Sequence, residues 1–497
     1  MTVTQAVEKL LEIQKKLTAY NHACGLLYYD GVTTAPKDTS DVRGETLAIL
    51  GEASYLLSTG EETAAVLDFL NEHTDELDAK IKRIVYLMNK ELRELRSIPM
   101  NEYIEYQKLL NDAQAVWHTA KEESNFAMFE PYLTRIVETN LRFAKYMDPE
   151  KHPYDVWLDK YEPGLTMEKC EIFFSALKEK LVPLIRKIGE KEQLSDSIIH
   201  GDFPIDAQRQ LSDRLMEIMC IDRGHCGIGE TEHPFTTDFT KYDVRITTNY
   251  HEDDFSDSMF SVIHEGGHAL YELNTADEYA YTCLGTGVSM GIHESQSRFY
   301  ENLIGRSEGF CELVFPELQR LFGLEGYTAD DLYRAVNRAQ PSLIRIAADE
   351  LTYSMHIMVR YEIEKMLMNG TVAVKNLPET WNRLYKEYLG VDVPDDKRGV
   401  LQDSHWSGGS IGYFPSYALG SAYGAQFLAK MRESLDVDSI VKSGDLSPVN
   451  AWLEEKIWRH GSMYEPTELL DMILDEPFDP TYFTDYLTEK FSALYNL

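Results

Sequence analysis

Cysteine is scarce in this chain, with six residues among 497. Cys220 and Cys226 are the nearest pair, with His225 between them, and no two cysteines have the CxxC spacing of a structural zinc site. A disulfide framework would instead group its cysteines within a short secreted chain. The cysteine content therefore excludes a disulfide-stapled module and indicates reduced, mostly buried thiols in a cytoplasmic protein.

Long apolar runs are also absent. No stretch approaches the ~20 consecutive apolar residues that a membrane-spanning helix requires. Residues 1–17 form an amphipathic helical pattern with charges of both signs, and they lack the apolar run of a signal peptide. We therefore expect a cytoplasmic protein with no membrane partner.

Basic residues are outnumbered by acidic ones. The chain has 48 Lys and Arg against 83 Asp and Glu, which gives a net charge of −35. Such an excess repels the phosphates of nucleic acids and of anionic lipids. Hydrophobic residues make up 43% of the chain, enough for a large core. The composition predicts a globular protein that handles small or cationic molecules, with no nucleic-acid partner.

Apolar residues recur with a helical period through most of the chain. The pattern predicts helices over 1–23, 40–58, 60–95, 100–123, 126–147, 167–190, 204–222, 291–306, 309–323, 327–338, 345–369, 375–388, 417–435, 446–459, 466–475 and 479–492. Between 235 and 250, β-branched and aromatic residues alternate with polar ones, which predicts one or two short strands. Because no linker or internal repeat interrupts the pattern, we expect one mainly helical body spanning 1–497.

The motif His264-Glu265-Gly266-Gly267-His268 is the most informative stretch of the sequence. Residues four apart on a helix lie on one face, so the two imidazoles can hold a single metal ion, usually zinc. Glu265 can take a proton from water at such a site. Two adjacent glycines cost about 1 kcal/mol each in a helix, which indicates that room is needed for a substrate strand or for a closely packed helix.

A zinc site needs a third protein ligand. The metzincin pattern is excluded because Tyr271 and Asn274 occupy the places where it requires Gly and His. Glu272 lies on the same helix face as the motif, where a third ligand cannot easily reach the ion, so we expect it behind the ligands or at the surface. Glu294, at the start of the next helix, is the preferred ligand, and His293 is the alternative.

Further motifs carry a resemblance to a known family. The chain resembles the carboxypeptidase Taq family of zinc metallocarboxypeptidases over most of its length. The matching segments are His233-Pro234-Phe235, Asp243-Val244-Arg245-Ile246-Thr247, the metal motif itself, His293-Glu294-Ser295, Ile344-Arg345-Ile346-Ala347-Ala348-Asp349 and Gly399-Val400-Leu401-Gln402-Asp403-Ser404-His405-Trp406. A departure occurs near the N-terminus, where Tyr29-Asp30 and Ala35-Pro36 stand in place of Trp-Asp and Met-Pro.

The resemblance implies a saddle-like helical fold with a deep cleft and a small β-sheet beside the metal helix, similar to neurolysin-type zinc peptidases. It implies an N-terminal helical lid over roughly 1–150 and a catalytic part over roughly 200–430. The implied activity is the removal of C-terminal residues from peptides with broad preference, in a homodimer. His264, His268 and Glu294 would hold Zn²⁺, for which Co²⁺ can substitute.

The reaction also needs donors for the oxyanion that develops at the scissile carbonyl. Tyr417 lies twelve residues beyond His405, a spacing similar to that of the His and Tyr donors in the related helical oligopeptidases. Tyr413 is a second candidate beside the substrate. The alternative is packing, because the chain has 30 tyrosines. Asp403 is interpreted either as a substrate contact or as a carboxylate that orients a ligand histidine.

An exopeptidase must recognise a free carboxylate, which arginine does best through a two-pronged contact. Arg245 and Arg345 are the candidates. The alternative is that each pairs with its motif neighbour, Asp243 or Asp349, and only braces the fold. His233 is expected on the cleft wall, near the substrate.

Two other functions compete with a carboxypeptidase. An endo-acting zinc oligopeptidase would share the metal chemistry but lack the carboxylate anchor. A catalytically inactive helical scaffold that binds peptides would belong to another class, and the presence of Glu265 argues against it because a structural metal site needs no base.

Overall fold

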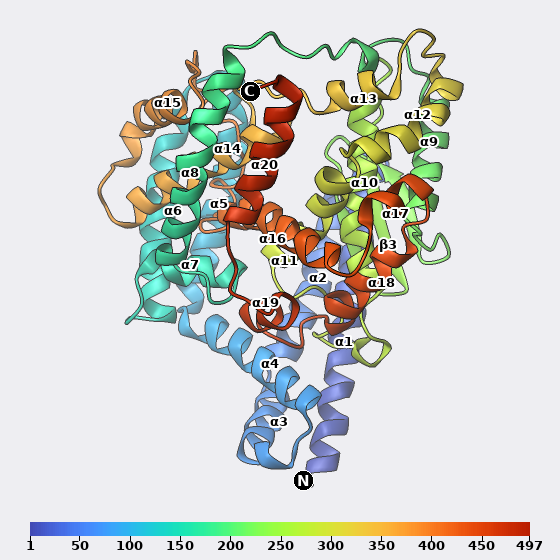
Figure 1. Ribbon diagram of the computed structural model, residues 1–497. Helices are drawn as coiled ribbons and strands as arrows, with labels where there is room; N and C mark the ends of the chain where they lie inside the picture. Colours follow the sequence, from blue (N-terminus) through green and yellow to red (C-terminus); the bar gives the residue numbers. More distant parts are fainter.

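The computed structural model describes residues 1–497 and consists of helices around one small sheet (Figure 1). The helices are α1 (Val3–Thr33), α2 (Ser40–Thr59), α3 (Glu61–Glu72), α4 (Ala79–Ser97), α5 (Met100–Glu122), α6 (Phe126–Met147), α7 (Pro153–Tyr161), α8 (Met167–Gly189), α9 (Ile205–Ile218), α10 (Phe255–Leu273), α11 (Met290–Arg298), α12 (Glu308–Phe322), α13 (Ala329–Val336), α14 (Glu350–Met368), α15 (Leu377–Tyr388), α16 (Phe414–Arg432), α17 (Val437–Ser443), α18 (Ser447–Lys456), α19 (Pro466–Leu474) and α20 (Thr481–Tyr495). The strands are β1 (Cys226–Glu230), β2 (Thr236–Thr240) and β3 (Asp243–Thr248). The mainly α class with a small sheet is confirmed.

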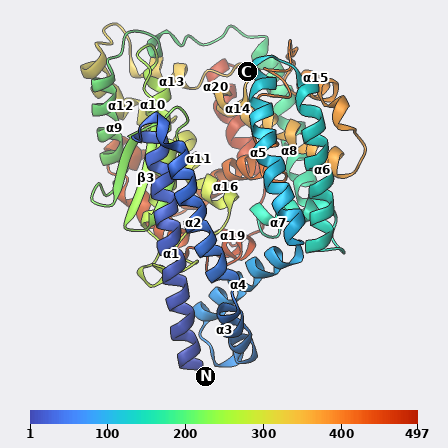
Figure 2. The same cartoon turned by 180° about the vertical axis from the view of Figure 1, so that it is seen from behind.

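The helices form two groups that lie side by side in both views (Figures 1 and 2). One group contains α5, α6, α7, α8, α14, α15 and α20, and the other contains the sheet with α9, α10, α12, α13, α17 and α18. Helices α11 and α16 lie between the two groups, and α1, α3 and α4 extend away from them toward the N-terminus. This arrangement agrees with the expected saddle-like body. None of the helices combines the length and apolar character needed to cross a membrane.

The sheet has three strands in the order β1-β3-β2 and lies against α10. β3 pairs with β1 in parallel and with β2 in antiparallel orientation. β2 and β3 confirm the strands predicted over 235–250. β1 was not predicted, because its sequence Cys-Gly-Ile-Gly-Glu contains two glycines, which are depleted in strands. Gly229 in β1 leaves room for α1, since a Cβ there would lie 2.3 Å from the Tyr29 hydroxyl.

Several predicted helix boundaries are wrong. The single helix predicted over 60–95 is two helices, α3 and α4, because Asp78 accepts a hydrogen bond from the Ile81 amide at 2.8 Å and starts a new helix. The helix predicted over 345–369 begins at Glu350, since Asp349 caps it through the Thr352 amide at 3.0 Å. Helices α7 and α17 are too short to give a clear periodic signal.

The hydrophobic interior is divided into a large cluster and a small one. The large cluster runs from Tyr106 in α5 to Tyr495 in α20. The small cluster of 14 residues joins α1, α3 and α4, and also takes Tyr279 and Leu284 from the connection between α10 and α11. The N-terminal helices therefore pack on a core of their own, and the division into lid and catalytic part stays a prediction.

The two glycines of the metal motif make room for close packing rather than for a strand of substrate. A Cβ at Gly267 would lie 2.6 Å from the carbonyl oxygen of Gln296 and 2.7 Å from the Cα of Ser297, both in the backbone of α11. On the other side of α11, a Cβ at Gly420 of α16 would lie 2.7 Å from the Cβ of Glu294. Helix α11 is thus held between two glycine surfaces, and Glu294 is brought close to the motif histidines.

The variant Gly267→Ala tests this close packing. Because the new methyl group meets backbone and not a flexible side chain, α11 has to move, and we expect the free energy of unfolding to fall by about 1–3 kcal/mol. The matched control is Gly51→Ala in α2, where nothing lies within 4 Å of the added Cβ. There the better helix propensity of alanine should raise stability by up to ~1 kcal/mol. Urea denaturation measures both, and an unchanged midpoint for Gly267→Ala would contradict the packing argument.

Candidate active site

Two histidines of α10 and a glutamate of α11 converge on one point. One ligand atom from each of His264, His268 and Glu294 can be chosen so that all lie within 4.8 Å of one another. Oε2 of Glu294 lies 3.8 Å from Nε2 of His264 and 3.4 Å from Nε2 of His268. Ligand atoms of a tetrahedral zinc ion, each about 2.1 Å from the metal, are roughly 3.4 Å apart. The donor set and its spacing therefore fit one divalent ion, and the structure brings together the three predicted ligands.

Glu294 is held as a carboxylate by its neighbours on the helix. Its Oε1 accepts a hydrogen bond from Nε of Arg298 at 2.7 Å, which leaves Oε2 directed toward the histidines. Burial opposes ionisation, but Arg298 together with His268 and His264 outweighs it, so the pKa of Glu294 lies well below its usual range. An ionised, buried carboxylate next to two imidazoles is suited to bind a cation.

The ring of His264 is oriented by a carboxylate at its Nδ1 atom. Nδ1 of His264 lies 2.8 Å from Oε2 of Glu301, which belongs to the π-helical segment Phe299–Ile304 that continues α11. Arg298 donates to the same oxygen at 2.9 Å. A carboxylate on the second ring nitrogen fixes the ring and leaves Nε2 for a metal ion. Glu301 was not among the predicted site residues, although its place two turns after Glu294 is a signal.

The second histidine is oriented by a relay of two residues. Nδ1 of His268 lies 2.6 Å from Nδ1 of His293, whose Nε2 lies 2.6 Å from Oε1 of Glu272. Both ring nitrogens of His293 are therefore engaged, and it lies behind His268, outside the ligand group. Glu272 is buried, at 2% exposure, so its interpretation as a surface charge is wrong. The alternative that it lies behind the ligands agrees with the geometry.

Glu265 lies beside the ligand group and contacts the sheet. It is buried, and the hydroxyl of Thr236 in β2 lies 2.6 Å from its Oε2. Burial raises the pKa of Glu265, and His264 and Thr236 oppose this. A raised pKa brings a carboxylate closer to the range in which it can both accept and return a proton. Thr236 was not predicted as a site residue, although it lies in the predicted strand just before the metal helix.

Three further candidates meet at the start of α16. Nε2 of His405 lies 3.2 Å from the hydroxyl of Tyr417, and the rings of Tyr413 and Tyr417 are 5.0 Å apart. Burial lowers the pKa of His405 to about 4 and raises the pKa of Tyr413 to about 12. Burial also raises the pKa of Tyr417 above its usual range. The histidine is therefore neutral at neutral pH, and both phenols keep their protons.

This cluster lies near the ligand group. Tyr417 is one turn before Gly420, the residue of α16 that touches Glu294. The charge of Glu294 also contributes to the raised pKa of both Tyr413 and Tyr417. The phenolic O–H groups of Tyr413 and Tyr417 are therefore near the charge of Glu294, and their role as donors stays a prediction.

Arg345 does not pair with Asp349. It lies in a 3₁₀ turn before α14, at 7% exposure, and its Nε donates to Oδ1 of Asp403 at 2.9 Å. Arg360 of α14 donates through Nε to the other oxygen of Asp403 at 2.7 Å. Asp349 is instead engaged as the cap of α14. Two guanidinium groups share one carboxylate, so this buried cluster has one positive charge in excess.

Arg245 forms a two-pronged ion pair with Asp243. Its Nε and Nη2 each donate to a different oxygen of Asp243 at 3.0 Å, which is the bracing contact given as the alternative. Its side chain is 29% exposed. His233 is exposed in the turn before β2, and its carbonyl oxygen accepts a hydrogen bond from Thr231. No contact joins either residue to the ligand group.

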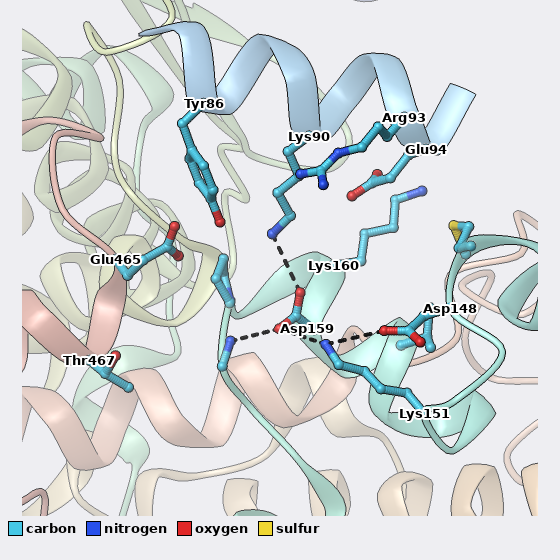
Figure 3. A pocket seen from close by; sticks show the side chains of 14 residues that line it. Tyr86, Lys90, Arg93, Glu94, Asp148, Lys151, Asp159, Lys160, Glu465 and Thr467 are labelled. Carbon is cyan, nitrogen blue, oxygen red and sulfur yellow. Dashed lines mark hydrogen bonds and ion pairs between the residues drawn. The ribbon is translucent and has the colours of Figure 1, made fainter. Parts of the chain in front are cut away.

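A separate cavity lies elsewhere in the molecule. It has a volume of about 510 Å³ and lies between α4, α7 and the start of α19 (Figure 3). Lys90, Asp159 and Lys151 form ion pairs along its wall. None of the predicted site residues lines it. The cavity is therefore separate from the converging His and Glu side chains.

Two histidines one turn apart, a glutamate next to the first, and a buried carboxylate from the adjacent helix define a helical metallopeptidase. Comparisons with known proteins give the family. The model of the carboxypeptidase Taq (M32) metallopeptidase family matches residues 9–491. Carboxypeptidase 1 of Bacillus subtilis strain 168 is 40% identical over 494 residues, 99% of each chain. Thermostable carboxypeptidase 1 of Pyrococcus furiosus is 35% identical and covers 98% of each chain.

The solved structures agree. The crystal structure of an M32 carboxypeptidase from Deinococcus radiodurans R1 has a TM-score of 0.97 and 31% identity, covering 99% of this chain and 100% of that one. Metallocarboxypeptidase 1 of Trypanosoma cruzi has a TM-score of 0.95 and 33% identity, covering 99% and 100%. The chain belongs to the carboxypeptidase Taq (M32) family, which confirms the resemblance, and it is a metallocarboxypeptidase, a hydrolase that acts on peptide bonds.

Removal of the paired carboxylate should lower the free energy of unfolding more at Arg345 than at Arg245. Asp403→Ala leaves Arg345 and Arg360 buried without their partner, so we expect the free energy of unfolding to fall by about 3–5 kcal/mol. Asp243→Ala is the matched control, because Arg245 is partly exposed, and it should cost less than ~1 kcal/mol. Urea denaturation measures both variants. Equal losses would contradict the distinction between a buried and a surface pair.

Proposed function

We propose that the protein is a zinc-dependent carboxypeptidase that releases C-terminal residues from peptides with broad preference. His264, His268 and Glu294 hold the ion, and Glu265 is the general base. The observation that carries this proposal is the convergence of the three ligand atoms within 4.8 Å, with a second partner behind each histidine. The chemistry of the donor set suits Zn²⁺, and Co²⁺ can replace it.

A zinc ion at these ligands supplies Lewis acidity and eases the ionisation of water. Glu265 takes the proton of the attacking water and later gives it to the leaving amine. The raised pKa of Glu265 supports this double role, because the group must be both a base and an acid near neutral pH. Thr236 orients the carboxylate by its hydrogen bond at 2.6 Å.

The oxyanion that develops at the scissile carbonyl is stabilised by neutral donors. Tyr417 and His405, in contact at 3.2 Å, are assigned this role, and Tyr413 contacts the substrate beside them. A phenol whose pKa is raised stays protonated and can donate a hydrogen bond throughout the reaction. Because the site is buried, each such donor acts more strongly than it would in water.

For the free carboxylate of the substrate we propose Arg345 ahead of Arg245. The pair of Arg345 and Arg360 exceeds the charge of Asp403 by one, so a positive charge is available to a substrate. Arg245 is matched one to one by Asp243, which leaves no such excess. Arg245 and His233 are kept as candidates for the outer cleft wall, since both are partly or fully exposed.

The remaining expectations are a cytoplasmic location, peptide partners with a free C-terminus and a homodimer. The first is supported by the six cysteines, none of which forms a disulfide. The homodimer rests on the family resemblance, and sedimentation equilibrium tests it.

The product pattern of one peptide tests the activity. We expect stepwise loss of C-terminal residues from a peptide with a free C-terminus, no cleavage of its C-terminally amidated copy, and no cleavage after chelation of the metal, all followed by mass spectrometry. Glu265→Gln is the control for contaminating peptidases, and it should keep its zinc while turnover falls at least about 100-fold. Internal fragments from the amidated peptide would favour the endo-acting oligopeptidase, and no cleavage by the zinc-loaded protein would favour an inactive scaffold.

Zinc titration of the metal-free protein tests the ligands. Glu294→Ala removes a direct ligand and should raise the Kd for zinc more than His293→Ala does, since His293 acts through His268. For His293→Ala we expect a rise of about 10–100-fold. The reverse order would transfer the ligand role from Glu294 to His293.

A further inference from the structure

Glu162 is a buried carboxylate that the proposed mechanism does not use. It ends α7 and is only 2% exposed. Its side chain reaches the N-terminus of α11, where the amide of Gly291 donates a hydrogen bond to Oε2 at 2.7 Å. The hydroxyl of Tyr423 in α16 lies 3.5 Å from Oε1. Three segments that are far apart in the sequence therefore meet at this one side chain.

Glu162 is held by hydrogen bonds and forms no ion pair. Burial raises its pKa to about 7, and Ser289, the Gly291 amide and Tyr423 oppose this. No arginine or lysine forms an ion pair with it, so the carboxyl group lacks the usual compensation for burial. In either protonation state, however, an oxygen remains that can accept the hydrogen bond from Gly291.

Glu162 completes the first turn of the helix that carries the proposed ligand. Ser289 caps α11 by accepting from the Ile292 amide at 3.1 Å, and Glu162 satisfies the neighbouring amide of Gly291. A Cβ at Gly291 would lie only 2.6 Å from Oε2 of Glu162. The carboxyl group thus lies directly against the helix backbone, where it can fix both the height and the rotation of α11. Glu294 follows one turn later on the same side.

We infer that Glu162 is a positioning residue of the metal site: by anchoring the first turn of α11 to α7, it sets the place at which Glu294 meets His264 and His268. This inference rests on the ligand role proposed for Glu294. Gly267 and Gly420 hold α11 from its two sides, but neither glycine restrains the helix along its own axis. Glu162 supplies that restraint, because it ends α7, which lies in the group of helices that contains α5, α6 and α8 (Figure 1).

Zinc titration of the metal-free, full-length protein tests this role. Glu162→Ala removes the acceptor, so we expect the Kd for zinc to rise by about 10–100-fold, with most of kcat regained at saturating zinc and KM unchanged. Glu162→Gln keeps an acceptor oxygen of the same shape, and its Kd should stay close to that of the wild type. Gly291→Ala displaces the carboxyl group and should weaken zinc binding as Glu162→Ala does, which keeps the test decisive if Glu162→Ala does not fold.

Glu364→Ala is the matched control for Glu162→Ala. Glu364 in α14 is also a buried carboxylate whose pKa is raised to about 7, and it accepts from Trp406 at 2.8 Å and from the Gly412 amide at 2.9 Å without touching α11. We expect this variant to lower Tm and to leave the Kd for zinc unchanged. An equal rise in Kd for Glu364→Ala, or a wild-type Kd for folded Glu162→Ala and Gly291→Ala, would overturn the positioning role.

The outcome for Glu294→Ala separates this inference from the proposed function. If Glu294→Ala weakens zinc binding and the Glu162 and Gly291 variants do not, only the positioning role fails. If Glu294→Ala itself binds zinc as the wild type does, the ligand assignment fails, and the inference fails with it.

Discussion

The close approach of α11 to α10 and α16 is the constraint on which the active site depends. Helix axes normally lie 8–10 Å apart because side chains separate them. At Gly267 and at Gly420 no side chain intervenes, and a Cβ on either would lie within 2.7 Å of atoms in α11. Each glycine weakens its own helix by about 1 kcal/mol, a cost that is small against the geometry it permits. Only at this separation can the short side chain of Glu294 reach the two imidazoles of the neighbouring helix.

Once α11 is in place, the charges around the ligands determine what the site can hold. Glu265 and Glu294 are buried, and the side chains of Glu301, Arg298 and Arg306 beside them are less than 20% exposed. Carboxylates exceed guanidinium groups by one in this group. Buried charge is tolerated only when it is paired, and a divalent cation at the histidines relieves the excess. Glu301 accepts from His264, and Glu272 accepts from His293, which lies behind His268. One nitrogen of each ligand histidine therefore stays directed at the same point. The site is therefore organised for a cation before one binds.

The sequence predicts local relations well and long-range ones poorly. The spacing of His264 and His268 is a property of a single helix, so their common face could be read from the motif, and Glu294 followed from the next helix. Thr236 and Glu301 could not be assigned in this way, because their contacts depend on how a strand and a π-helical segment pack against α10. The two glycines signalled a close approach, but not whether a helix or a substrate would occupy the space.

The ion pairs of the two arginines show the same limit of sequence-based prediction. Asp349 is near Arg345 in the sequence, yet its carboxylate accepts from the backbone amides of Thr352 in α14 and of Gln340. The true partner, Asp403, is 58 residues away. Arg245 and Asp243 are two residues apart in β3, so their side chains lie on the same face of the strand. Their pairing therefore follows from the local pattern. A motif neighbour is thus a reliable partner within a strand and an unreliable one at a helix cap, where the backbone competes for the same carboxylate.

The interior of the site has two poles, a region with an excess of negative charge and a region with an excess of positive charge. At one pole the carboxylates of Glu265, Glu294 and Glu301 exceed their cations, which favours a metal ion. At the other pole Arg345 and Arg360 exceed Asp403 by one charge, which favours an anion. Tyr417 connects the poles, since its ring lies 5.3 Å from the guanidinium of Arg345 and its helix touches Glu294 at Gly420. The end of a peptide has a matching pattern, with a polarisable carbonyl one residue away from a free carboxylate. Under the proposed function, this pair of opposite poles would align a chain end in one direction, and an internal peptide bond, which lacks the carboxylate, would lack the second contact.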